Sequence, residues 1–136
     1  MSPITHLLVV ANRTADSDEL LEDLEQRAAG APITVTLITP QDTSGGSGPR
    51  LRAALERLQD AGIDAVGMLG DTDPVTAVLD EWDPRRYDEI VVSTLPVGLS
   101  RWLGIDLPHR IARATDAVVH HVEARERHAF EPLRTG

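Results

Sequence analysis

The chain has 136 residues, a net charge of -9 and no Cys. This length suits one hydrophobic core, and no apolar run approaches the roughly 18 residues that a membrane span needs. The negative charge opposes binding to nucleic acid, because that affinity depends on neutralising phosphates. The first residues carry neither a basic leader nor a cleavage site. We therefore expect a cytoplasmic protein without nucleic-acid or membrane partners.

The chemistry of the basic side chains is limited, because all 13 basic residues are Arg. Without Lys or Cys the chain has no Walker lysine, Schiff base, thiol nucleophile or thiolate metal site. Adjacent His120 and His121 are expected to point to opposite faces of a strand, which excludes joint coordination of one metal ion. No Gly-x-Ser-x-Gly context orders a hydrolase triad. The sequence therefore predicts no catalytic residues, no metal and no enzymatic activity.

Short apolar stretches alternate with amphipathic ones along the chain. We expect strands at 5–12, 32–38, 63–69, 87–95 and 117–122, with helices between them. This alternation predicts a doubly wound α/β fold, in which helices cover both faces of a parallel sheet.

The ends of several helices are marked by capping residues. We expect Asp16 or Ser17 to act as the N-cap of the first helix, Asp73 to cap a later helix, and Asp106 to cap a helix from Leu107 to Ala114. Trp82 and Trp102 lie on apolar helical stripes and are expected in the core or an interface. The residues predicted to face inward are Leu20, Leu21, Leu24 and Ala28, then Leu51, Ala54, Leu55 and Leu58, then Val75, Val78, Leu79 and Trp82, and finally Ile111 and Ala114.

Residues 40–49, PQDTSGGSGP, contain three glycines and no apolar residue besides proline. A glycine-rich loop can hold phosphate, but this one lacks both the dinucleotide glycine spacing and the lysine of a P-loop. We interpret it as a flexible connector.

Two stretches resemble the universal stress protein family: GDTDPVTAVLDEWDPRRYDEIVVSTLPVGLSRWLG, and IARATDAVVHHV after it. The resemblance extends over residues 5 to 122. It implies a sheet order of 3-2-1-4-5, within a domain of residues 1–123 that is followed by a charged tail of residues 124–136.

The nucleotide-binding branch of that family has an Asp at the end of the first strand and a G-x2-G-x9-G-[ST] loop after the fourth. This chain has Asn12 at the first position, and Pro96 offers no backbone N-H in the loop. A capping Asp106 at the next helix start would repel phosphate. We expect an altered nucleotide pocket, weak or absent ATP binding and no cofactor.

The candidate ligand-binding residues lie beyond the carboxyl ends of the first and fourth strands, where open α/β sheets bind ligands. They are Asn12, Ser93, Thr94, Gly98 and Arg101. An equally weighted alternative to ligand binding is that Asn12 only terminates the strand. The alternative for the Ser93 and Thr94 hydroxyls is that they cap the loop. A local basic cluster of Arg101, His109, Arg110 and Arg113 is either a solvated face or a surface that docks an anion or a partner.

The resemblance implies a homodimer that pairs along the fifth strand, through Ala117, Val118, Val119, His120, His121 and Val122. Protonation of close His120 and His121 copies would weaken the dimer near pH ~6.5, whereas solvated rings would leave it indifferent to pH.

The leading hypothesis is a non-enzymatic, stress-linked binding or regulatory protein with an altered nucleotide pocket. A receptor for an adenine nucleotide or other small anion is the alternative, and a small α/β hydrolase is the third.

Overall fold

The computed structural model describes residues 3–43, 45–96 and 98–125. The strands are β1 (Thr5–Val10), β2 (Ile33–Pro40), β3 (Asp64–Gly70), β4 (Glu89–Thr94) and β5 (Val119–Glu123). The helices are α1 (Asp18–Gly30), α2 (Ser47–Asp60), α3 (Pro74–Glu81), α4 (Arg101–Gly104) and α5 (Leu107–Thr115). No helix within these ranges is long and apolar enough to cross a membrane.

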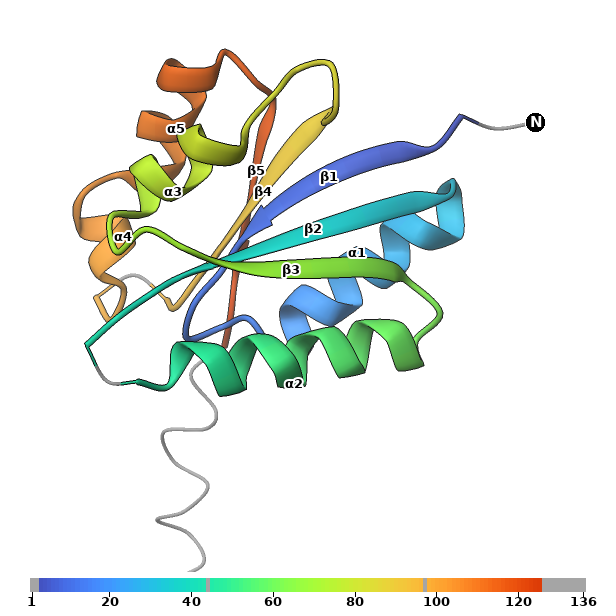
Figure 1. Cartoon of the computed structure of the whole chain (residues 1–136), viewed down its shortest axis with the longest axis horizontal. Coiled ribbons are helices and arrows are strands. Elements are labelled where there is room, and N and C mark those ends of the chain that lie inside the picture. The colour runs from blue at the N-terminus through green and yellow to red at the C-terminus, as the bar shows by residue number, and fades with distance from the viewer. Residues whose placement is uncertain (1–2, 44, 97, 126–136) are drawn as a thin grey trace, which may run out of the picture.

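The five strands form one sheet in the order β3-β2-β1-β4-β5 (Figure 1). Every pairing is parallel, and β1 is paired on both sides: Leu7 lies opposite Val35 of β2 and opposite Glu89 of β4. The predicted fold class and strand order are confirmed. The chain reverses its direction of winding between β1 and β4, so the carboxyl ends of these neighbours form a topological switch point.

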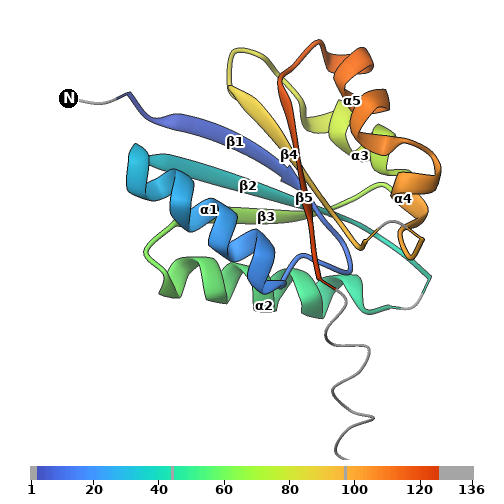
Figure 2. The same cartoon turned by 180° about the vertical axis from the view of Figure 1, so that it is seen from behind.

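Helices lie on both sides of the sheet, as Figures 1 and 2 show from opposite directions. The side chains of Leu7 and Val9 pack into a core with α1 and α2, while Leu8 and Val10 pack into a second core with α3 and α5. All four are essentially inaccessible to solvent. A strand buried on both faces requires a continuous apolar run, and this is why LLVV does not alternate with polar residues.

Most predicted element boundaries differ from the structure by one to three residues. The larger difference concerns residues 40–49, because α2 begins at Ser47 and the connector is shorter than expected. Of the predicted tail, Ala124 is buried and Arg125 pairs with Glu19 at 2.6 Å, while residues 126–136 lie outside the described part.

Of the predicted N-caps, Ser17 rather than Asp16 caps α1, Asp73 is confirmed and Asp106 is wrong. The Ser17 and Asp73 side chains accept hydrogen bonds from Leu20 and Thr76 N-H groups. Asp106 stands before α5 in the left-handed region, with φ 56, and makes no capping bond. Its carboxylate bonds the His109 ring at 2.9 Å instead, and Pro108 offers no N-H at the second helical position.

Two residues predicted to face inward are exposed. Leu79 is 45% exposed, because α3 packs on the core through Ala77 and Val78 and ends soon afterwards. Ala114 is exposed because it lies in the last turn of α5, beyond the core contact of Ile111. Trp82 and Trp102 pack against the second core, as predicted.

Gly70 brings the end of β3 into close contact with α3. A Cβ at this position would lie 2.8 Å from both Ala77 Cβ and Ile38 Cγ2, so we expect Gly70→Ala to lower the free energy of unfolding by about 1–3 kcal/mol. Gly30→Ala is the control, because a Cβ there meets nothing within 4 Å and its helical site favours Ala by up to about 1 kcal/mol. Urea denaturation measures both. Equal stability of the two variants would contradict the close approach.

Candidate functional site

A cavity of about 510 Å³ opens at the carboxyl ends of the central strands. Its wall is formed by the ends of β2 and β4 and by the segments that follow β1, β2 and β3, and the segment after β4 closes one side. Its lining consists of Asn12, Arg13, Thr14, Pro40, Gln41, Asp42, Thr72, Pro74, Ser93, Thr94, Leu95, Leu99, Ser100, Arg101, Trp102 and Ile105. A volume in this range and a mixed polar and apolar wall are typical of small-molecule sites.

The structure brings four of the five candidate ligand-binding residues to this cavity. Asn12, Ser93, Thr94 and Arg101 line it. Gly98 is not among the lining residues, although it belongs to the same segment after β4 and has a φ of 93° that favours glycine.

The two predicted hydroxyl groups are both occupied within the chain. Ser93 Oγ lies 2.6 Å from Thr14 Oγ1, and both side chains are buried. Thr94 Oγ1 donates to the Leu95 carbonyl at 2.8 Å and lies 2.7 Å from His121 Nε2. These bonds fix the end of β4, which favours the capping interpretation of the two hydroxyls.

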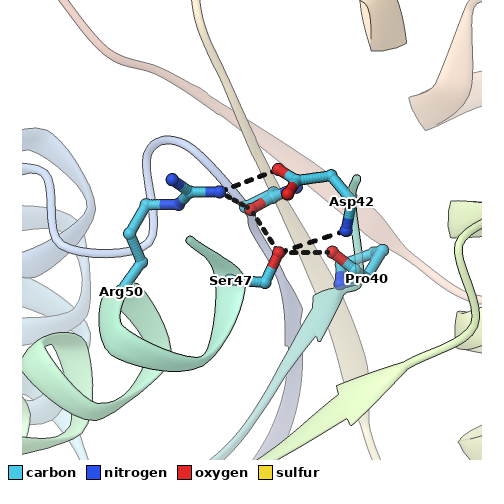
Figure 3. Close-up of polar contacts among 5 residues, drawn as sticks. Pro40, Asp42, Ser47 and Arg50 are labelled. Carbon is cyan, nitrogen blue, oxygen red and sulfur yellow. Dashed lines mark hydrogen bonds and ion pairs between the residues drawn. The ribbon is translucent and has the colours of Figure 1, made fainter. Parts of the chain in front are cut away.

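A polar cluster joins the end of β1 to the start of α2 (Figure 3); we call Asn12, Asp42, Ser47 and Arg50 the β1/α2 cluster. Arg50 Nη2 donates to both Asn12 Oδ1 and Asp42 Oδ2 at 2.8 Å. Asn12 Nδ2 donates to Asp42 Oδ2 at 3.1 Å. Ser47 Oγ lies 3.4 Å from both Asn12 Oδ1 and the Pro40 carbonyl, and it accepts from the Asp42 N-H at 3.2 Å.

Both ends of the Asn12 side-chain amide are used within the β1/α2 cluster. The Asn12 amide is bound to Asp42 and Arg50, so its main role in this structure is to connect the end of β1 to the start of α2. A carboxylate is nevertheless present next to it, supplied by Asp42 from the β2/α2 connection. Because Arg50 pairs with that carboxylate, the cluster adds no net charge to the cavity.

Two arginines at the cavity carry charge that the chain does not balance locally. Arg13 and Arg101 are exposed, and neither has an ion pair or hydrogen bond within the described residues. Asp42, already paired with Arg50, is the one carboxylate among the described lining residues. The cavity is therefore electropositive in a protein of net charge -9, which favours an anionic ligand.

Asp73, next to the lining residue Pro74, fixes the start of α3 at the cavity wall. The Asp73 side chain caps α3 and accepts from the Thr76 hydroxyl at 2.6 Å, which lowers the pKa of the Asp73 carboxyl below its ordinary value. The cap fixes Pro74, which lines the cavity.

The predicted basic cluster is dispersed. Arg101 lines the cavity, whereas Arg110 and Arg113 lie exposed on α5 and His109 Nδ1 bonds the Asp106 carboxylate at 2.9 Å. Asp106 does not line the cavity, so its predicted repulsion of a phosphate there is not supported by its position.

Within the described residues, no three His, Asp or Glu side chains are arranged to hold a metal ion.

Sequence reasoning missed three contributors to the site. Arg13 follows Asn12 and had no distinguishing pattern. Asp42 lies in the connector of residues 40–49 that we interpreted as flexible, Arg50 follows that connector, and only the strand order brings them to the end of β1. The parallel order places β2 beside β1, so a polar residue just after β2 was the available signal.

Arg50 is expected to stabilise the site's framework. Arg50→Ala removes a donor from both Asp42 and Asn12 in a partly buried site, so we expect a loss of about 1–2 kcal/mol in the free energy of unfolding. Arg52→Ala is the matched control, because Arg52 is exposed on the same helix and has no hydrogen bond or ion pair among the described residues; its effect should stay within about 0.5 kcal/mol. Urea denaturation separates the two, and equal losses would contradict this role.

Several solved structures share this architecture. A universal stress protein in complex with cAMP is 23% identical with a TM-score of 0.61, and the match covers 89% of this chain and 98% of that one. A universal stress protein from Archaeoglobus fulgidus is 13% identical with a TM-score of 0.64, covering 87% and 93%. The universal stress protein from Archaeoglobus fulgidus in complex with dAMP is 14% identical with a TM-score of 0.62, covering 90% and 99%.

No family model matches this sequence, and no curated protein matches it at a significant level. The likeness to solved structures extends over nearly the whole of each chain compared. The expected architecture is thus confirmed by both the strand order and the comparisons: the chain has the universal stress protein fold.

Proposed function

We propose that this chain is a non-enzymatic regulatory protein of the universal stress protein family that binds an adenine nucleotide in its altered pocket. The observation that carries the proposal is the electropositive cavity at the carboxyl ends of β1 and β4. Two neighbours with this fold are in complex with cAMP and dAMP, which supports the adenine nucleotide class. The apolar part of the wall, with Trp102 and Leu99, offers a surface on which a base can pack.

The hydrogen-bond pattern supports binding rather than catalysis. A nucleophilic hydroxyl needs a base that accepts its proton. The Thr94 hydroxyl donates to the Leu95 carbonyl at 2.8 Å, and its oxygen lies 2.7 Å from His121 Nε2. Ser93 is buried and bonded to Thr14. Neither hydroxyl is arranged for attack on a ligand.

A direct titration tests the proposal. We expect AMP to bind the full chain with a Kd of about 10–100 μM, or roughly -7 to -5.5 kcal/mol, and to change tryptophan fluorescence. Trp102 lines the cavity, whereas Trp82 stacks on Tyr87 with ring centroids 6.2 Å apart. The fluorescence change should therefore disappear in Trp102→Phe and persist in Trp82→Phe. No calorimetric binding of AMP, cAMP or adenosine at about 1 mM would contradict the proposal.

The proposal includes a homodimer that pairs along β5. This strand is an edge of the sheet, and Val118 just before it is 60% exposed. Val119 and Val122 pack partly on the cores of their own chain. His120 Nε2 lies 2.5 Å from Glu89 Oε1, and His121 bonds Thr94, so both rings have partners on β4. The chain thus offers an unpaired backbone edge and one large apolar side chain for self-association.

Matched substitutions at the two sheet edges test the dimer. Val118→Asp places a charge at the proposed interface, and we expect it to convert the dimer to a monomer in sedimentation at pH 8. Val66→Asp on β3 is the control, since Val66 is 59% exposed on the opposite edge. A monomeric parent chain contradicts the dimer, and dissociation by Val66→Asp alone places it at β3. A parent dimer unchanged at pH 5.5 contradicts only the predicted histidine switch.

A further inference from the structure

We propose that Arg13 and Arg101 form an anion clamp that holds a single phosphoryl group of the ligand and makes the pocket selective for a nucleoside monophosphate. This inference rests on the proposed function and specifies the ligand class of the same cavity. The two arginines enter from different walls. Arg13 follows β1, and Arg101 begins α4 after β4, so they are brought together by two strands that are neighbours in the sheet.

Much of the described backbone after β4 is committed within the chain. Pro96 has no N-H, and its carbonyl accepts from the N-H groups of Leu99 at 3.0 Å and Ser100 at 3.2 Å. The N-H groups of Leu103, Gly104, Ile105 and Asp106 bond Ser100 Oγ, Ser100 O, Arg101 O and Leu103 O. The charge that attracts an anion to this cavity therefore comes from side chains.

The charged side chains that remain for this task are the two guanidinium groups, beside the neutral donors of Gln41 and Thr72. The hydroxyls of Thr14, Ser93 and Thr94 bond within the chain. Arg50 is committed to Asn12 and Asp42. Arg13 and Arg101 have no such partners among the described residues, and a guanidinium fork binds phosphate oxygens in a bidentate way.

The charge around the cavity favours one phosphoryl group over three. Two guanidinium groups balance a phosphate monoester, which carries about -1.5 to -2 at pH 7. The chain has no Lys to balance further phosphates. Asp71 and Asp73 flank the lining residue Thr72. A longer polyphosphate would therefore add negative charge close to carboxylates.

Calorimetric titration of the full chain with AMP, adenosine, ATP and inorganic phosphate tests the clamp. We expect AMP to bind about 10-fold or more tightly than adenosine, and more tightly than ATP. Arg13→Gln and Arg101→Gln should each weaken AMP binding by about 5- to 20-fold and leave adenosine binding unchanged. AMP binding should weaken between 50 and 300 mM salt in the parent chain, and much less in the double variant.

Arg113→Gln is the control, because it removes the same charge from an exposed position on α5 outside the cavity. We expect parent affinity for AMP in this variant. Thermal denaturation of all variants checks that each is folded, which is expected because the three side chains are exposed.

Four other outcomes of these titrations would each support or overturn a separate part of the inference. Equal binding of AMP and adenosine by the parent chain overturns the clamp while the adenine receptor stands. Equal losses of AMP affinity in Arg113→Gln and the cavity variants overturn it as a general charge effect. Tighter binding of ATP than AMP overturns the monophosphate selectivity. Phosphate binding that needs both arginines, without adenosine binding, supports the clamp and contradicts the adenine part of the proposed function.

Discussion

The burial of β1 on both faces is the constraint from which the rest of the structure follows. Its side chains between Leu7 and Val10 have no contact with solvent, so both faces of the strand must be covered by apolar layers. Parallel pairing to β2 and β4 satisfies its backbone, and the right-handed crossovers then distribute the helices over two faces. Where β1 ends, the layers diverge, and the cavity opens at that point.

Polar groups at the end of a buried strand need partners, because desolvation without a hydrogen bond costs free energy. The β1/α2 cluster provides most of them: one guanidinium reaches both Asn12 and Asp42, while among the described residues the Arg50 Nε and Thr39 Oγ1 atoms stay buried without a partner. Asn12 is thus held by Asp42, from the connection between β2 and α2, and by Arg50 of α2. Both a carboxylate and a guanidinium therefore lie next to the neutral Asn12 amide at that edge of the sheet.

The sequence predicted the fold well because its signals are local. Apolar runs, the helical spacing of Leu51 and Leu58 and the Asp73 cap act within a few residues. The failures came from interactions that no local pattern contains. The Asp106 carboxylate bonds the His109 ring rather than the helix backbone, and the roles of Asn12, Asp42 and Arg50 depend on contacts between residues 30 to 38 positions apart as well as on nearby ones. Four of the predicted residues lie at one cavity because strand ends converge by topology, but the hydrogen bonds that occupy the hydroxyls of Ser93 and Thr94 depend on side-chain geometry.

The open edges of the sheet present a second physical problem. On β3, Val66, Met68 and Leu69 are exposed next to an unpaired backbone edge, an arrangement that invites association with other chains. On β5 the exposed positions are His121 and Glu123, which are more polar. The net charge of -9 opposes indiscriminate contact between copies, because it makes the molecules repel one another at low ionic strength. Short-range edge pairing is then favoured only where a specific geometry overcomes that repulsion. The same excess of carboxylates makes an electropositive cavity a local feature, which an anionic ligand distinguishes from the rest of the surface.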